Sequence, residues 1–245
     1  MASRSFICVA AVLALTLAPV PGQAHDHAAM GHEPVAALPE PDYAVASPGT
    51  YELQRIMRSP DGTVLDTGGK SQPLSRYTQG KVTLLAFIFT HCSDVNGCPA
   101  AYVLNQQLKG AIEQRPALAP LRGKVRLVSL SFDPRHDTPE VMRSYGEGAG
   151  DPDAGVEWDF LTTSGPDALV PLLDGFGQDV SVAANAPDDT QDFAHMLKLF
   201  LLDSGGTVRE IYSSAFLQPL VVLNDIQTLA MEQAHAPAHH HAARH

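Results

Sequence analysis

Hydrophobic residues fall into short runs whose spacing switches between the periods of strands and helices. Residues 82–89 are apolar on both faces, which is typical of a central strand that helices cover on each side. Pro99 follows soon afterwards and begins a stripe of apolar residues with helical spacing. The predicted strands are residues 51–57, 63–65, 82–89, 125–132, 157–162, 197–202 and 207–212. The predicted helices are residues 99–114, 139–146, 166–176 and 219–232.

This order of elements predicts an α/β fold, with a mixed sheet flanked by helices. Strands joined through a helix should pair in parallel, whereas the turn at residues 203–206 should join two antiparallel strands. A turn at residues 59–62 predicts that residues 51–57 and 63–65 form an N-terminal β-hairpin extension. Residues 178–191 show little pattern, and we expect a long surface loop there.

The two ends of the chain differ from its middle. Residues 1–24 combine a basic start, an apolar stretch and small residues, which predicts a cleaved signal peptide and export to the periplasm. A membrane span needs about 20 apolar residues, so this stretch is too short, although a retained signal would anchor the protein. We expect no stable membrane span after cleavage. The predicted division is a signal peptide at 1–24, a flexible His-containing segment at 25–48, a folded domain at 49–232 and a His-rich tail at 233–245.

The charge and the histidine content limit the kinds of molecule and metal ion that the protein is expected to bind. The net charge is -11 and Lys and Arg are not clustered, so nucleic acid and anionic membranes are poor partners. Eight of the eleven histidines lie in the two predicted tails, where they would bind copper, zinc or nickel loosely. The alternative is a low-complexity tail without a metal-binding role.

Two cysteines, Cys92 and Cys98, remain once Cys8 is removed with the signal peptide. They lie between a predicted core strand and a predicted helix, and the helix N-terminus should favour the thiolate form. In an oxidising compartment the simplest alternative is a structural disulfide. The sequence therefore predicts a reactive thiol site and leaves metal binding, redox chemistry and a structural disulfide open.

Four motifs occur in one order along the chain: Thr90-His91-Cys92, Cys98-Pro99, the stretch from Ser131 to Glu140, and Ala194-His195-Met196. Together they resemble the Sco/SenC family of exported copper proteins with a thioredoxin-like fold, over residues 74–231. The resemblance implies one copper ion, as Cu(I) or Cu(II), held by Cys92, Cys98 and His195. Five residues separate the two cysteines here, whereas three are usual in the family.

The resemblance also implies a function. It suggests a copper chaperone, or metallochaperone, that assists assembly of the copper centre of a respiratory cytochrome c oxidase. The partners would be an oxidase subunit or another copper acceptor, and periplasmic thiol-redox proteins. The alternatives are a thiol-disulfide oxidoreductase and a periplasmic copper store or sensor. We favour a protein without catalytic residues, since residues 192–196 lack the proline that guides disulfide substrates in thioredoxin-type reductases.

If the protein is an enzyme, Cys92 and Cys98 are its redox-active pair. In the metal-free, oxidised protein we also expect these two cysteines to form a disulfide bond.

The sequence also suggests where five residues near the cysteines and His195 should lie or what they should do. His91 should not be a ligand, because adjacent side chains at the end of a strand point apart. Met196, beside an apolar strand, is expected in the core. Asp94 is expected to be a solvated loop acid, whereas Asp133 and Asp137 should brace the loop that follows the second core strand.

Overall fold

The computed structural model describes residues 38–92, 94–182 and 193–235, all within one compact unit. The signal peptide expected at residues 1–24 and most of both predicted tails lie outside these residues. Within the described part of the chain, no helix has the length and apolar character needed to cross a membrane.

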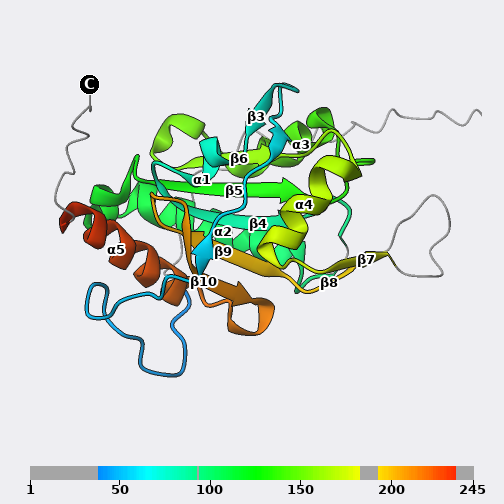
Figure 1. Ribbon diagram of the computed structural model, residues 1–245. Coiled ribbons are helices and arrows are strands. Elements are labelled where there is room, and N and C mark those ends of the chain that lie inside the picture. The colour runs from blue at the N-terminus through cyan, green and yellow to red at the C-terminus, as the bar shows by residue number, and fades with distance from the viewer. Residues whose placement is uncertain (1–37, 93, 183–192, 236–245) are drawn as a thin grey trace, which may run out of the picture. The chain divides into compact units, whose positions relative to one another are not determined.

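A six-stranded mixed sheet forms the centre of this unit (Figure 1). In sheet order its strands are β1 (Met57–Arg58), β10 (Thr207–Ser213), β9 (Lys198–Leu202), β4 (Val82–Ile88), β5 (Val125–Ser131) and β6 (Glu157–Leu161). β4, β5 and β6 run parallel, and β9, β10 and β1 extend the sheet with antiparallel pairing. All seven residues of β4 are buried, which confirms its predicted place at the centre of the fold.

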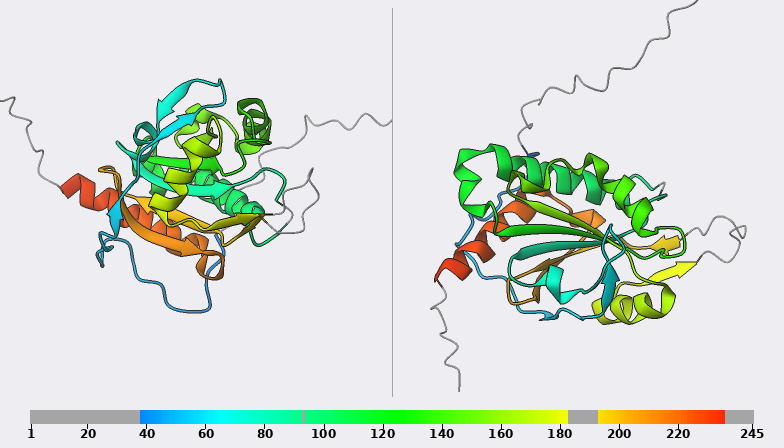
Figure 2. Two further views of the ribbon diagram at one scale, coloured as in Figure 1. Left: turned by 45° about the vertical axis from the view of Figure 1, so that its right-hand side comes forward. Right: turned by 90° about the horizontal axis from the view of Figure 1, so that it is seen from above.

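Helices cover both faces of the sheet. They are α1 (Ser75–Thr78), α2 (Cys98–Gln114), α3 (Pro139–Gly146), α4 (Pro166–Phe176) and α5 (Pro219–His235), with 3-10 helices at Pro116–Leu121, Glu147–Ala149, Pro152–Ala154 and Ser214–Phe216. α2 and α5 lie on one face, and α1 and α4 lie on the other (Figure 2). Phe87 of β4 packs edge-on against Phe176 of α4, with ring centroids 5.3 Å apart, so the core is continuous between sheet and helix.

The pairing predicted for the N-terminal hairpin is wrong. A hairpin is present, but β2 (Thr63–Leu65) pairs with β3 (Ser71–Pro73), whereas β1 joins the edge of the main sheet beside β10. The Arg209 guanidinium donates to the carbonyls of Leu53 and Gln54, and this holds the chain before β1 close to β10. Long-range contacts with β10 and the turn before it, which include backbone hydrogen bonds of Ile56 and Ser59, therefore accompany this pairing.

Two other segments differ from the expected pattern. β7 (Val180–Val182) pairs with β8 (Phe193–His195) where a surface loop was expected, although residues 183–192 lie outside the described part. Leu38 is 5% exposed and the Ala46 carbonyl accepts a hydrogen bond from Asn224 of α5. The chain thus contacts the folded unit before the boundary expected at residue 49.

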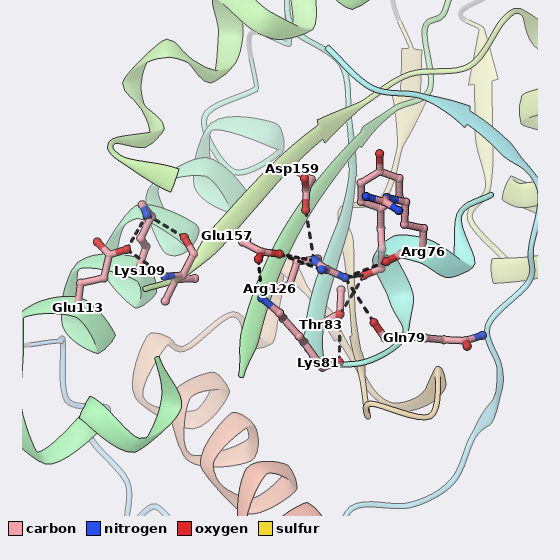
Figure 3. A network of polar contacts seen from close by, with 11 residues as sticks. Arg76, Gln79, Lys81, Thr83, Lys109, Glu113, Arg126, Glu157 and Asp159 are labelled. Atoms are coloured by element: carbon pink, nitrogen blue, oxygen red, sulfur yellow. Dashed lines mark hydrogen bonds and ion pairs between the residues drawn. The ribbon is translucent and has the colours of Figure 1, made fainter. Parts of the chain in front are cut away.

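A charged network joins the starts of β4, β5 and β6 (Figure 3). The Arg126 guanidinium bonds Glu157 at 2.8 Å and lies 3.4 Å from Asp159, while Lys81 bonds Glu157 at 2.6 Å. Arg126 also donates to the carbonyls of Arg76 and Tyr77 at the end of α1. These contacts link the starts of the three parallel strands to one another and to α1.

Candidate functional site

The two cysteines lie in the loop between β4 and α2, at the carboxyl end of the central strand. Cys98 is the first residue of α2 and is 1% exposed, and its sulfur accepts a hydrogen bond from the Phe89 N–H at 3.4 Å. Cys92 is partly exposed, and both residues are free thiols. The predicted location between a strand and a helix start is therefore confirmed.

A tight turn within the intervening residues folds the loop back on itself. Asp94 forms the turn, because its side chain accepts from the Asn96 N–H and its carbonyl accepts from the Gly97 N–H. A Cβ atom at Gly97 would lie only 3.2 Å from the Cys92 sulfur, so glycine permits this close approach. Asp94 is exposed as expected, and it also shapes the loop that brings Cys92 back towards Cys98.

The environment of Cys98 opposes ionisation in the metal-free protein. Burial raises the pKa of the Cys98 thiol well above its usual range, and the neighbouring Cys92 raises it further, against the stabilising Phe89 N–H. For Cys98, the cost of desolvating a thiolate exceeds the help expected from the helix start. A bound cation would supply the missing compensation, because metal binding displaces the thiol proton.

His195 is the last residue of β8, and its backbone pairs with Val180. Its side chain lies outside the described part of the structure. The next residue, Met196, lines a groove of about 890 Å³ together with Asp94 and Gly97 of the cysteine loop. The chain that carries His195 therefore runs beside the loop that carries both cysteines.

Met196 does not occupy the core position that the sequence suggested. Its side chain is 61% exposed and faces the groove, whereas Leu197 and Leu199 that follow it are buried. The buried residues begin at Leu197, where the strand was predicted to start, and Met196 before it leaves a thioether at the surface next to His195 in the chain.

The loop between β5 and α3 lies against the cysteine loop. Asp137 is fully buried and accepts hydrogen bonds from the Thr90 N–H at 3.0 Å, the Thr90 hydroxyl and the Ser131 hydroxyl. Thr138 caps α3 by accepting from the Val141 N–H. The bracing role predicted for Asp137 is confirmed, and this carboxylate fixes the start of the Thr90-His91-Cys92 motif.

Three residues of these loops form a cluster that sequence reasoning missed. One ring nitrogen each from His91 and His136 and one carboxylate oxygen from Asp133 lie within 4.8 Å of one another. His91 Nε2 is 3.9 Å from Asp133 Oδ2, and the two imidazole centroids are 4.4 Å apart. The sequence could have indicated this cluster, because these residues follow the adjacent parallel strands β4 and β5, and the carboxyl ends of parallel strands meet at one edge of the sheet.

Known proteins resemble this chain in fold and, at low identity, in sequence. The SCO1/SenC family profile matches residues 63–231. A SCO1 protein homolog from Bacillus subtilis is 24% identical over 188 residues, which cover 75% of this chain and 86% of that protein. The structure of Bradyrhizobium japonicum ScoI with copper bound is 22% identical and covers 69% of this chain and 98% of its own, with a TM-score of 0.53.

A third similarity is to BsSco, described as a member of the Sco family of cytochrome c oxidase assembly proteins, in which a disulfide switch was identified. It is 21% identical, covers 74% of this chain and 98% of its own, and has a TM-score of 0.54. The mixed sheet flanked by helices matches these structures, and the predicted thioredoxin-like fold is confirmed. Because the family profile spans more than half of the sequence, the chain belongs to the SCO1/SenC family.

Proposed function

We propose that this protein binds one copper ion through Cys92, Cys98 and His195 and delivers it to the copper centre of a respiratory cytochrome c oxidase. The observation that carries the proposal is the convergence of two free thiols at the end of β4, beside the chain segment that ends in His195. The copper-bound ScoI structure and the BsSco description support the choice of metal and acceptor. We also propose that the protein is exported to the periplasm, because residues 1–24 have the pattern of a signal peptide.

The donor set suits a copper carrier. Thiolate sulfur favours Cu(I), and imidazole accommodates Cu(II), so two cysteines and one histidine hold either oxidation state. Cys98 contributes a buried sulfur fixed at the start of α2, whereas Cys92 lies on a loop with access to solvent. An acceptor protein would therefore reach the copper ion from the side of Cys92.

Copper titration of the mature chain tests the metal site. Protein that is reduced and loaded anaerobically with Cu(I), in competition with a chelator, should hold one tightly bound ion. Cys92→Ser and Cys98→Ser should each abolish tight binding, and Cys98→Ala serves as a second variant if the buried serine disturbs packing. Copper affinity equal to wild type in the variants at both cysteines would refute the site.

His195 provides the sharper test of the ligand set. His195→Ala should alter the Cu(II) spectrum most, because two thiolates still retain Cu(I). Glu140→Ala is the control, since Glu140 is an exposed side chain on α3 outside the proposed copper site. An unchanged Cu(II) spectrum in His195→Ala would exclude this histidine as a ligand. Transfer of copper to a purified oxidase copper-site domain then tests delivery.

A second function, thiol-disulfide exchange, is favoured by one specific observation. The pair combines a partly exposed Cys92 with a buried Cys98, an arrangement in which one sulfur attacks a disulfide and the other resolves the mixed disulfide. An oxidoreductase would reduce insulin or glutathione disulfide with turnover, would lose this activity with either cysteine, and would be insensitive to His195→Ala. Strong turnover together with an unchanged Cu(II) spectrum in His195→Ala would establish the enzyme in place of the carrier.

A further inference from the structure

We propose a second metal site, formed by His91, Asp133 and His136, that binds a divalent first-row ion such as Zn(II). It lies beside the thiol pair but uses neither cysteine. The proposal is independent of copper carriage, since it rests on the geometry of two imidazoles and one carboxylate.

The three side chains already lie close together. Their nearest ligand atoms fall within 4.8 Å of one another, and zinc bonds to histidine nitrogen and carboxylate oxygen are about 2.0–2.2 Å long. Tetrahedral ligands at that distance are about 3.4 Å apart, so side-chain rotations that bring these atoms about 1 Å closer together would form the site. The imidazole rings of His91 and His136 meet at 62° with centroids 4.4 Å apart, and His91 Nε2 is 3.9 Å from the Asp133 carboxylate.

A buried carboxylate orients one of the two histidines. Asp137 Oδ1 lies 3.0 Å from His136 Nδ1, and Asp137 is itself fixed by Thr90 and Ser131. An Nδ1–H donated to Asp137 leaves the Nε2 lone pair free to bind an ion, which is the arrangement found around histidine ligands in metal sites. Asp137 is therefore a positioning residue, and it links the proposed site to the loop that carries Cys92.

Exposure gives the site a closed side and an open side. The Asp133 side chain is 6% exposed, whereas the side chains of His91 and His136 are 35% and 56% exposed. An ion can enter from solvent past the imidazoles and meet the carboxylate at the base, with positions left for water. Two nitrogens and one oxygen favour Zn(II), Cu(II) or Ni(II) over Cu(I), which prefers the thiol pair.

Zn(II) binding to the full chain without thiols tests the proposal. In protein carrying Cys92→Ser and Cys98→Ser, each histidine is modified with diethyl pyrocarbonate and quantified by peptide mass spectrometry, with and without Zn(II). Zn(II) should protect His91 and His136 together, and at lower concentration than it protects the histidines of residues 25–37 and 236–245. Removal of the cysteines makes this result independent of the copper proposal.

Substitutions identify the ligands. Asp133→Asn should raise the Zn(II) concentration needed to protect His91 by at least the roughly 10- to 100-fold that loss of a supporting group causes in metal sites. Glu140→Gln, an exposed acid in the first turn of α3, should leave protection unchanged. If Asp133→Asn fails to fold, the more exposed His136→Gln provides the same comparison. Equal modification of His91 with and without Zn(II), or protection that survives both substitutions, would overturn the proposal.

Discussion

Two cysteines of one loop have different environments. Cys98 is buried at the start of α2 with its sulfur accepting a hydrogen bond from a backbone N–H, and burial raises its pKa, whereas Cys92 is accessible to solvent. Nucleophilic reactions of cysteine require both access and the thiolate form. The two sulfurs should therefore differ in reactivity although only five residues separate them.

Alkylation should separate the two thiols. In reduced, metal-free protein we expect iodoacetamide to modify Cys92 at least about tenfold faster than Cys98, because Cys98 is buried and predominantly protonated. A time course followed by peptide mass spectrometry measures both rates. The same reaction in guanidinium should equalise them, and equal rates in the folded protein would contradict the described environment of Cys98.

Asp137→Ala should destabilise the fold by about 2–4 kcal/mol, because three donors from Thr90 and Ser131 would lose a buried, charged acceptor. The free energy of unfolding in urea measures the effect. Glu140→Ala, which removes an exposed carboxylate three residues away, is the matched control and should change stability by less than about 0.5 kcal/mol. Equal losses in the two variants would remove the special role given to Asp137.

At the scale of elements, sequence patterns located most of the helices and strands but not all of their partners. α4 begins at Pro166 and ends before a left-handed Gly177, so local chemistry marks both of its ends. The pairing of β1 was missed because its partners in β10, Arg209 among them, lie about 150 residues away in the sequence. The cluster of His91, Asp133 and His136 was missed for a related reason, since side-chain direction in loops is set by the packed structure.

Asp159, in β6, should make stability depend on pH. Burial raises the pKa of its carboxyl from about 4 to about 6, and the nearby Arg126 only partly opposes this. The native state therefore holds this proton more tightly than the unfolded chain, so ionisation costs stability as pH rises from about 4 to above 6. One third of the side chain is exposed, and solvent screening should limit the cost to about 1–2 kcal/mol.

Asp159→Asn should abolish this dependence. Relative to wild type, the variant should gain about 1–2 kcal/mol in free energy of unfolding between pH 4 and pH 8, measured with urea at both values. Asp153→Asn, which alters an exposed acid, should show no such gain. A gain of the opposite sign would mean that the ion pair with Arg126 outweighs the burial of Asp159.

For the molecule as a whole, the histidine-rich ends should act separately from the folded unit. Deletion of residues 25–37 and 236–245 should lower the total uptake of Cu(II) or Zn(II) and leave one tight Cu(I) ion bound. The lost uptake should fade as pH falls through about 6.5, where histidine side chains take up a proton. An unchanged binding isotherm after deletion would identify the ends as inert segments.

The N-terminal limit of the folded unit can be tested by a longer deletion. Removal of residues 25–48 takes away Leu38, which is buried, and Ala46, whose carbonyl bonds Asn224. Loss of the Leu38 side chain alone should cost about 1.5–3 kcal/mol. Urea unfolding should therefore show lower stability than in the deletion that ends at residue 37, and equal stabilities would restore the boundary at residue 49.

The two edges of the main sheet affect how readily the protein aggregates at high concentration. β1 contributes only Met57–Arg58 at one edge, and at the other the chain after β6 is bridged at Thr162 by Leu65 through two backbone hydrogen bonds. Long, open edges recruit strands from other molecules and begin aggregation, whereas short or covered edges do not. The segments that bring β1 and Leu65 to the sheet thus protect it against intermolecular strand pairing, and their loss should promote fibrillar association before it affects the thiol pair.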